Sequence, residues 1–157
     1  MDVLVYAALC PKGEEHSCAY LLLSSVVQRV YGLSTLPCIA REEGGKPYFP
    51  ERPDICFNLS HSYGAVVCAV HDRLVGVDIE KLRPAPKRLA AGLDDCTFFR
   101  RWTAMEASVK RDGKGIAALR RDFEPDPFCE SSEELLPGWI VTVCPSGKAE
   151  VRFLRDE

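Results

Sequence analysis

The first third of the chain alternates between a strand-like and a helix-like apolar pattern. Residues 2–9 (DVLVYAAL) form a short, β-branched run before a Pro-Lys-Gly turn, which predicts a strand. Residues 14–31 contain no glycine or proline, and their apolar residues recur at helical spacing until Gly32. This pattern predicts an amphipathic helix that ends at a glycine. A short strand is expected over 38–41, with a turn over 43–47.

The middle of the chain consists of short apolar runs separated by turn residues. The runs at 55–60, 65–70 and 73–80 predict three consecutive strands. We expect the last two to form a hairpin around Asp72 and Arg73, because only a few residues separate them.

The last part of the chain predicts one helix and a pair of strands. The helix is expected over 97–112 with Gly113 as its stop, and 138–143 and 149–154 are expected to form a hairpin. The candidate N-cap residues of this helix are Asp94, Asp95 and Thr97. Because strands and helices do not alternate regularly, the predicted class is α+β.

Composition excludes several classes of function. The chain has 157 residues, 46% apolar and 27% charged, with a net charge of −3. These are ordinary globular values without the basic field that draws proteins to nucleic acid. No apolar run reaches the roughly 18 residues of a membrane span. The eight cysteines contain no C-x-x-C pair, and together with the absence of a signal peptide they favour reduced core thiols in a cytoplasmic protein.

Two acidic residues lie two positions apart at the end of a predicted strand. Asp78 and Glu80 therefore point to the same face, and we expect Asp78 to face solvent. Adjacent carboxylates repel each other unless a cation lies between them. A solvated strand edge that carries these acids by chance is the alternative.

The predicted second helix carries a stripe of functional side chains. Trp102, Glu106 and Lys110 are spaced i, i+4, i+8, so they share one face. The acid and the lysine could form only an exposed ion pair, but Trp102 indicates that this face is partly buried. A buried carboxylate needs a partner, and a metal ion is one candidate. Lys114 follows between two glycines, where backbone can approach a ligand closely.

Polar side chains gather at the end of the strand predicted at 55–60. Asn58, Ser60, His61 and Ser62 directly precede a Tyr-Gly turn. Such residues are unusual in a core strand and suit an anion site, although a lone histidine is more often structural.

Four strings in this order resemble the Sfp-type 4′-phosphopantetheinyl transferases. They are GGKPYF (44–49), FNLSHS (57–62), GVDIE (76–80) and WTAMEASVK (102–110) with its sequel GKG (113–115). Each string alone is a weak match, whereas four in the expected order are specific.

The resemblance implies a Mg²⁺-dependent, holo-[acyl-carrier-protein] synthase type transferase. A serine of an apo acyl or peptidyl carrier protein would attack the β-phosphate of coenzyme A, and 3′,5′-adenosine bisphosphate would leave. Magnesium suits a few carboxylates together with substrate phosphates. By position, the resemblance assigns Asp78, Glu80 and Glu106 to the metal, Lys46, Ser60, His61 and Lys110 to coenzyme A, and a catalytic role to Glu106 and Lys110.

The resemblance also implies a fold of two similar α+β halves related by a pseudo-twofold axis. The halves would be 1–72, which contacts coenzyme A, and 73–157, which binds the metal. Coenzyme A would lie in the cleft between them, where small-molecule sites are physically expected.

The chain departs from the family at three places. Met105 stands where a lysine is usual, so one phosphate or acidic-partner contact is expected to be missing. The connector 81–101 is short and leaves little room for the helical segment that commonly engages the carrier protein. The residues for the adenine-side phosphate are not identifiable, and Lys12, Arg29 and Arg41 are equal candidates.

Two alternatives remain open at this stage. The first is a degenerate module that binds coenzyme A or a carrier protein without transfer. The second is a magnesium-dependent hydrolase of a nucleotide pyrophosphate, which would release phosphopantetheine to water.

Overall fold

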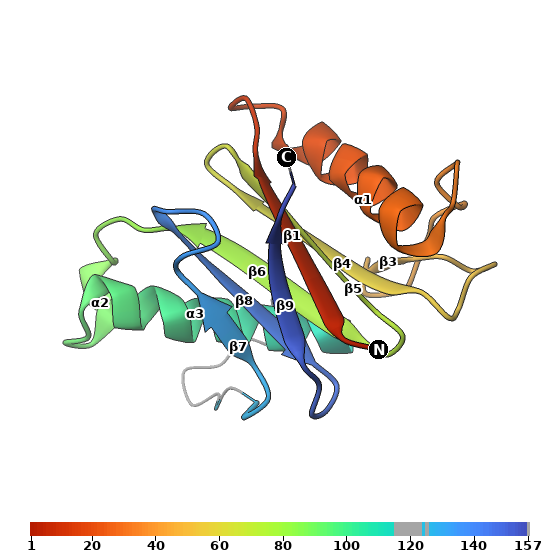
Figure 1. Cartoon of the computed structure of the whole chain (residues 1–157). Coiled ribbons are helices and arrows are strands. Elements are labelled where there is room, and N and C mark those ends of the chain that lie inside the picture. The colour runs from red at the N-terminus through yellow and green to blue at the C-terminus, as the bar shows by residue number, and fades with distance from the viewer. Residues whose placement is uncertain (115–123, 125, 157) are drawn as a thin grey trace.

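Two β-sheets face each other, and one long helix covers the outer face of each (Figure 1). This computed structural model describes residues 1–114, 124 and 126–156. The predicted α+β class is confirmed. In chain order the elements are β1 (Val3–Leu9), α1 (Glu15–Tyr31), β2 (Ala40–Arg41), β3 (Pro47–Tyr48), β4 (Cys56–Ser62), β5 (Ala65–His71), β6 (Val75–Lys81), α2 (Lys87–Ala90), α3 (Asp95–Asp112), β7 (Glu130–Ser132), β8 (Trp139–Pro145) and β9 (Val151–Arg155).

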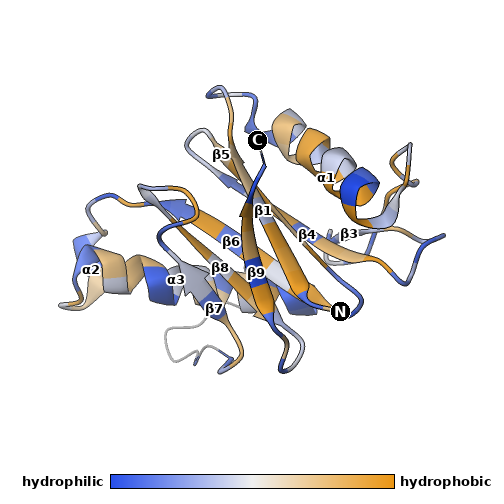
Figure 2. Ribbon diagram, viewed as in Figure 1, coloured by the Kyte–Doolittle hydropathy of each residue, from blue (hydrophilic) through white to orange (hydrophobic). Residues whose placement is uncertain are grey.

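The first sheet has the strand order β4-β5-β1-β9. β5 is antiparallel to both β4 and β1, whereas β9 runs parallel to β1. Every residue of β5 is buried, because one face packs on α1 and the other on the second sheet. β1, which pairs with β5 at the centre of the molecule, is also coloured mostly as hydrophobic (Figure 2). The core under α1 includes Leu23, Val26, Val27, Phe57 and Val70.

The second sheet has the strand order β6-β8-β7, with both pairs antiparallel. Val75, Val77 and Ile79 of β6 pack against the first sheet. The alternate residues of β6 therefore point to the other face, where α3 lies. α3 adds Phe98 and Phe99 to a smaller core on that face.

Both long helices end where the sequence predicts, whereas α1 begins at Glu15, one residue after its predicted start, and α3 begins at Asp95, two residues before its predicted start. Gly32 and Gly113 follow the last helical residues in the left-handed conformation, with φ of 69° at each. The Asp94 side chain caps α3 by accepting a hydrogen bond from Thr97 N at 2.9 Å. Among the described helices, none is long and apolar enough to cross a membrane.

Both predicted hairpins are wrong. β5 forms its hairpin with β4 instead, through the turn at Tyr63-Gly64, and its other edge is taken by β1. β6 therefore belongs to the second sheet and pairs with β8. β9 crosses to β1 and does not return along β8. A period of two predicts a strand but carries no information about its neighbours.

One pair of cysteines also contradicts the expectation of reduced thiols. Cys129 and Cys144 form a disulfide between the residue before β7 and the end of β8. The two positions meet because β7 and β8 pair antiparallel, a contact that spacing along the chain does not reveal. The free cysteines among the described residues are Cys10, Cys18, Cys38, Cys56, Cys68 and Cys96.

Gly76 lets α3 lie directly on β6. A β-carbon at this position would lie 1.9 Å from Ala107 O and 2.6 Å from Arg111 N, both backbone atoms of α3. We therefore expect Gly76→Ala to lower the free energy of unfolding by about 1–3 kcal/mol, because the helix must move away.

Urea denaturation measures this effect, with Gly147→Ala as the matched control. A β-carbon at Gly147 meets only the end of the Arg73 side chain, at 3.7 Å. Equal midpoints for the two variants would show that α3 does not pack closely on β6.

Candidate metal centre and anion pocket

Side chains rather than a main-chain ladder join the facing edge strands β4 and β6. The Asn58 Oδ1 atom accepts a hydrogen bond from Val77 N at 2.8 Å. Ser62 Oγ accepts one from Lys81 N at 3.1 Å, and Ser60 Oγ donates to Asp78 Oδ1 at 2.9 Å. We call this contact the β4–β6 seam; it consists of Asn58, Ser60 and Ser62 on β4 and the β6 groups to which they bond.

Two lysines satisfy further backbone groups along the seam. Lys110 Nζ donates to Val77 O at 2.8 Å and to Leu59 O at 2.7 Å, so it joins α3 to both strands. Lys46 Nζ donates to Val75 O at 3.2 Å and to Arg111 O at 2.8 Å. Burial lowers the pKa of both ammonium groups, and the neighbouring Asp78 and Glu106 carboxylates oppose this shift at Lys110.

Three carboxylates meet beside the seam. Asp78 and Glu80 lie on the face of β6 that α3 covers, and Glu106 comes from α3 itself. One oxygen of each lies within 4.8 Å of those of the other two. Asp78 is only 3% exposed, so the expectation that it faces solvent is wrong. It is buried because α3 and β4 close over this part of β6.

The electrostatics of this cluster fit a divalent cation. Burial and the neighbouring acids raise the pKa of Asp78 well above its usual range, although Lys110, with Nζ 4.0 Å from Asp78 Oδ1, opposes the shift. Burial also raises the pKa of Glu106. Within the described part of the chain, Asp78 Oδ2 is buried and has no hydrogen-bond partner. Three convergent carboxylates with an unpaired oxygen are a donor set that Mg²⁺ accepts.

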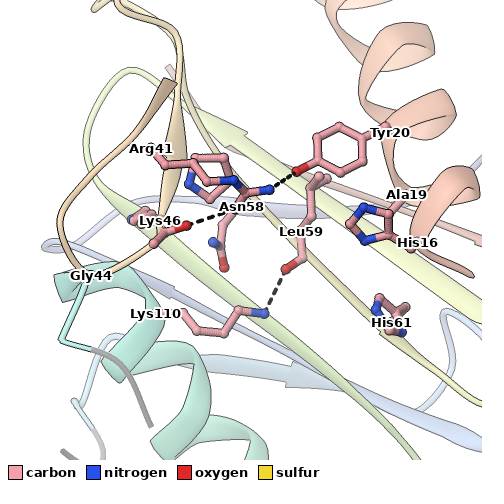
Figure 3. A pocket seen from close by; sticks show the side chains of 13 residues that line it. His16, Ala19, Tyr20, Arg41, Gly44, Lys46, Asn58, Leu59, His61 and Lys110 are labelled. Carbon is pink, nitrogen blue, oxygen red and sulfur yellow. Dashed lines mark hydrogen bonds between the residues drawn. The ribbon is translucent and has the colours of Figure 1, made fainter. Parts of the chain in front are cut away.

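The second feature of the site is a basic pocket of about 300 Å³ (Figure 3). Its walls come from α1, the β2–β3 loop, β4 and the C-terminal end of α3. Lys110 lines the pocket and also lies 4.0 Å from Asp78, so it connects the two features. The basic side chains that line it are His16, Arg41, Lys46, His61 and Lys110.

Arg41 is held at the wall of this pocket by two hydrogen bonds. Its Nη1 atom donates to Gly45 O at 2.9 Å, and its Nη2 atom donates to Tyr20 Oη at 3.0 Å (Figure 3). Tyr20 and His16 lie one turn apart on α1, so both reach the same wall. The arrangement combines a fixed guanidinium with a histidine and suits a phosphate group.

Only some of the candidate phosphate ligands line the pocket. Lys46 and His61 line the pocket, whereas Ser60 is 9% exposed and bonds to Asp78 in the seam. Lys114 is exposed and is not among the lining residues. Gly113 does allow a close approach, but the group that approaches it is the carboxylate of Glu42.

Of the three equal candidates for the adenine-side phosphate, only Arg41 lines the pocket. Arg29 pairs with Asp156 at 2.9 Å, and Lys12 lies outside the pocket. Sequence analysis missed His16 and Tyr20. Their spacing of four on one helix face was the available signal, but nothing in the chain indicated what that face meets.

Met105 is 8% exposed and lies on a buried side of α3. A cation on a buried helix face would have to leave water, which costs free energy unless it is paired. The methionine therefore contributes packing at this position.

Asp78→Asn should raise the stability of the protein in EDTA at pH 7. An acid with a raised pKa in the folded state contributes stability that is present below its unfolded pKa of about 4 and lost as pH rises through the folded value. Removing the charge removes this loss. We expect Tm to increase at pH 7, by roughly 2–4 °C for each kcal/mol regained, and to change little near pH 4.

Thermal melts across this pH range check the prediction, with Asp2→Asn as a control at an exposed acid. A lower Tm for Asp78→Asn than for the parent protein at pH 7 in EDTA would show that the Asp78 carboxylate is favourably paired without a metal.

Comparison with known proteins identifies the family. No family model matches the chain. The chain is 35% identical to 4′-phosphopantetheinyl transferase Sfp of Bacillus subtilis, over 79% of this chain and 70% of that protein. It is 34% identical to 4′-phosphopantetheinyl transferase psf-1 of Bacillus pumilus, over 87% and 74% of the two chains. It is also 34% identical to 4′-phosphopantetheinyl transferase HetI of a Nostoc species, over 64% and 52%. The chain therefore belongs to the Sfp-type 4′-phosphopantetheinyl transferase superfamily.

Proposed function

We propose that this protein transfers the 4′-phosphopantetheine arm of coenzyme A to a serine of an apo acyl or peptidyl carrier protein. The reaction requires Mg²⁺ and releases 3′,5′-adenosine bisphosphate, as in a holo-[acyl-carrier-protein] synthase. One observation carries the proposal: three carboxylates converge beside Lys110, which also lines a pocket together with four other basic side chains of the described residues. A pyrophosphate ester with a bound magnesium ion is complementary to both features.

Asp78, Glu80 and Glu106 are the proposed metal ligands. When bound, Mg²⁺ neutralises charge on the pyrophosphate and on the leaving phosphate. Asp78 and Glu106 have a raised pKa without the ion, because their negative charges are buried close together. Binding of Mg²⁺ would pair these charges with a cation. Glu106 is also the proposed acceptor of the serine proton, because its carboxylate belongs to the acidic cluster that would face the transferred group.

Lys110 is the proposed point charge on the transferred group. Its Nζ atom already lies where the pocket meets the acids, held by two backbone carbonyls. A fixed cation costs little reorganisation when charge develops in the transition state. Lys46 and His61 are proposed to contact coenzyme A with Lys110, and Lys114 stays a predicted contact although it lies outside the pocket lining. Ser60, which donates a hydrogen bond to Asp78, is proposed to position that carboxylate.

Arg41 and His16 are the proposed ligands of the adenine-side phosphate. They lie on the wall of the pocket formed by α1 and the β2–β3 loop, away from the acids that α3 and β6 present. This separation suits a ligand with phosphate groups at both ends of a nucleotide.

We also propose that residues 1–72 and 73–157 form two similar halves about a pseudo-twofold axis. The arrangement of one sheet and one long helix in each part supports this division. The strand β9 is an exception to this division, because it belongs to residues 73–157 but pairs with β1 in the first sheet. The cytoplasmic location stays a prediction, and the disulfide is a feature more common in oxidising compartments.

The alternatives differ in what happens to the phosphopantetheine. A module that only binds would leave coenzyme A intact. Met105 and the short connector 81–101 favour this possibility, whereas the complete set of Asp78, Glu80, Glu106 and Lys110 opposes it. A hydrolase would cleave coenzyme A without any carrier protein.

Intact mass spectrometry of an apo carrier protein tests the proposal. After incubation with the protein, coenzyme A and Mg²⁺, we expect the carrier to gain one phosphopantetheine, and EDTA to prevent the gain. Acyl and peptidyl carriers should both be tried, because the chain does not indicate which is served. Coenzyme A binding without any gain on either carrier would favour the binding module, and carrier-independent cleavage would favour the hydrolase.

Arg41→Met should raise the KM for coenzyme A about 10- to 100-fold, because a hydrogen bond to a charged group contributes about 1.5–3 kcal/mol. The kcat should change less, since Arg41 lies away from the acids. Steady-state kinetics with Lys12→Met as the control measures the effect. An unchanged KM for Arg41→Met would remove Arg41 from the binding site.

A further inference from the structure

Arg83 joins the proposed metal ligand Glu80 to the surrounding structure. Its Nη1 atom donates to Glu80 Oε2 at 2.9 Å and to Lys81 O at 2.8 Å. Ser62 Oγ, from the β4–β6 seam, lies 3.4 Å from the same Glu80 oxygen. Two donors on one oxygen fix the orientation of the whole carboxylate, because its two oxygens move together.

Two aromatic rings lie against the Arg83 guanidinium. Its Cζ atom lies 4.6 Å from the ring centroid of Phe99 and 5.1 Å from that of Tyr63. Phe99 belongs to α3 and is only 1% exposed, so it provides a rigid surface. Tyr63 comes from the β4–β5 turn in the other sheet. The planar guanidinium can stack on rings and donate hydrogen bonds at the same time, which a lysine cannot do.

The backbone of Tyr63 is strained, and the stacking gives a reason. Tyr63 has φ of 46°, in the left-handed region that favours glycine and asparagine. Among the described residues other than glycine, only Ala91 shares a positive φ. A two-residue hairpin turn normally places asparagine or glycine at this position. Strained backbone tends to persist where the side chain has a specific task, and here the ring contacts Arg83.

We propose that Arg83, which contacts the rings of Tyr63 and Phe99, is a positioning residue that orients Glu80 and thereby sets the affinity of the site for Mg²⁺. The inference rests on the proposed function, because it requires Glu80 to be a metal ligand. Groups that orient a metal ligand typically change metal affinity 10- to 100-fold when removed. The positive charge of Arg83 acts in the opposite direction by repelling the cation. Its side chain is 35% exposed and already paired with Glu80, so we expect the orienting effect to exceed the repulsion.

The experiment is a Mg²⁺ titration in the presence of saturating coenzyme A. It gives two midpoints: the Mg²⁺ concentration at half of the full increase in Tm, and the Mg²⁺ concentration at half-maximal transfer to the carrier protein. Arg83→Met should raise both midpoints about tenfold, and Arg83→Lys should give an intermediate value. Tyr63→Gly relieves the backbone strain but removes the ring, so it should raise the Mg²⁺ midpoint without loss of Tm in EDTA. Arg88→Met, at an exposed arginine of α2, is the matched control and should titrate like the parent protein.

The outcomes separate this inference from the proposed function. If the parent protein responds to Mg²⁺ and Glu80→Gln does not, but Arg83→Met and Tyr63→Gly titrate normally, the positioning role is wrong and the metal site stands. Tighter Mg²⁺ binding by Arg83→Met would likewise overturn the inference, since repulsion would then dominate. If the parent protein and Glu80→Gln both fail to respond to Mg²⁺, the proposed metal site itself fails.

Discussion

The free edge of β6 is the constraint from which the site follows. A strand edge exposes backbone donors and acceptors that must be satisfied, and within the described residues β6 pairs with a strand on only one side. On the other side of β6, side chains of β4 and two lysines form hydrogen bonds with its backbone atoms. These atoms are Val75 O, Val77 N, Val77 O and Lys81 N. This seam brings the two sheets together without merging them. It therefore leaves polar and charged groups, rather than a continuous ladder, at the place where the acids and the basic pocket meet.

The same seam explains why the acids are costly to the protein alone. Asp78 must lie on the face of β6 opposite to Val77 and Ile79, where α3 covers it. Glu106 on α3 then faces a second carboxylate in a region with little solvent, which raises the pKa of both groups. Lys110 offsets only part of this charge, because its single positive charge lies near both Asp78 and Glu106. A divalent cation would remove the imbalance, so binding and stability are coupled at this point.

The sequence predicted the features that local patterns determine. The ends of α1 and α3 follow from Gly32, Gly113 and Asp94, and the shared face of Asp78 and Glu80 follows from the pleat of a strand. It did not predict what depends on contacts between distant segments. The partners of β6 and β9, the Cys129–Cys144 disulfide and the burial of Asp78 all result from how the two sheets meet. His16 and Tyr20 were missed for the same reason, since only the fold places α1 against the β2–β3 loop.

In our proposal Asp78, Glu80 and Glu106 together hold the divalent ion that transfer requires. The most direct test of this proposal is a crystal structure with coenzyme A and Mn²⁺, with the ion located by its anomalous scattering. We expect one strong peak coordinated by all three carboxylates and by oxygens of the coenzyme A pyrophosphate. A peak elsewhere, or none between these acids in a preparation whose transfer activity depends on Mn²⁺, would contradict it.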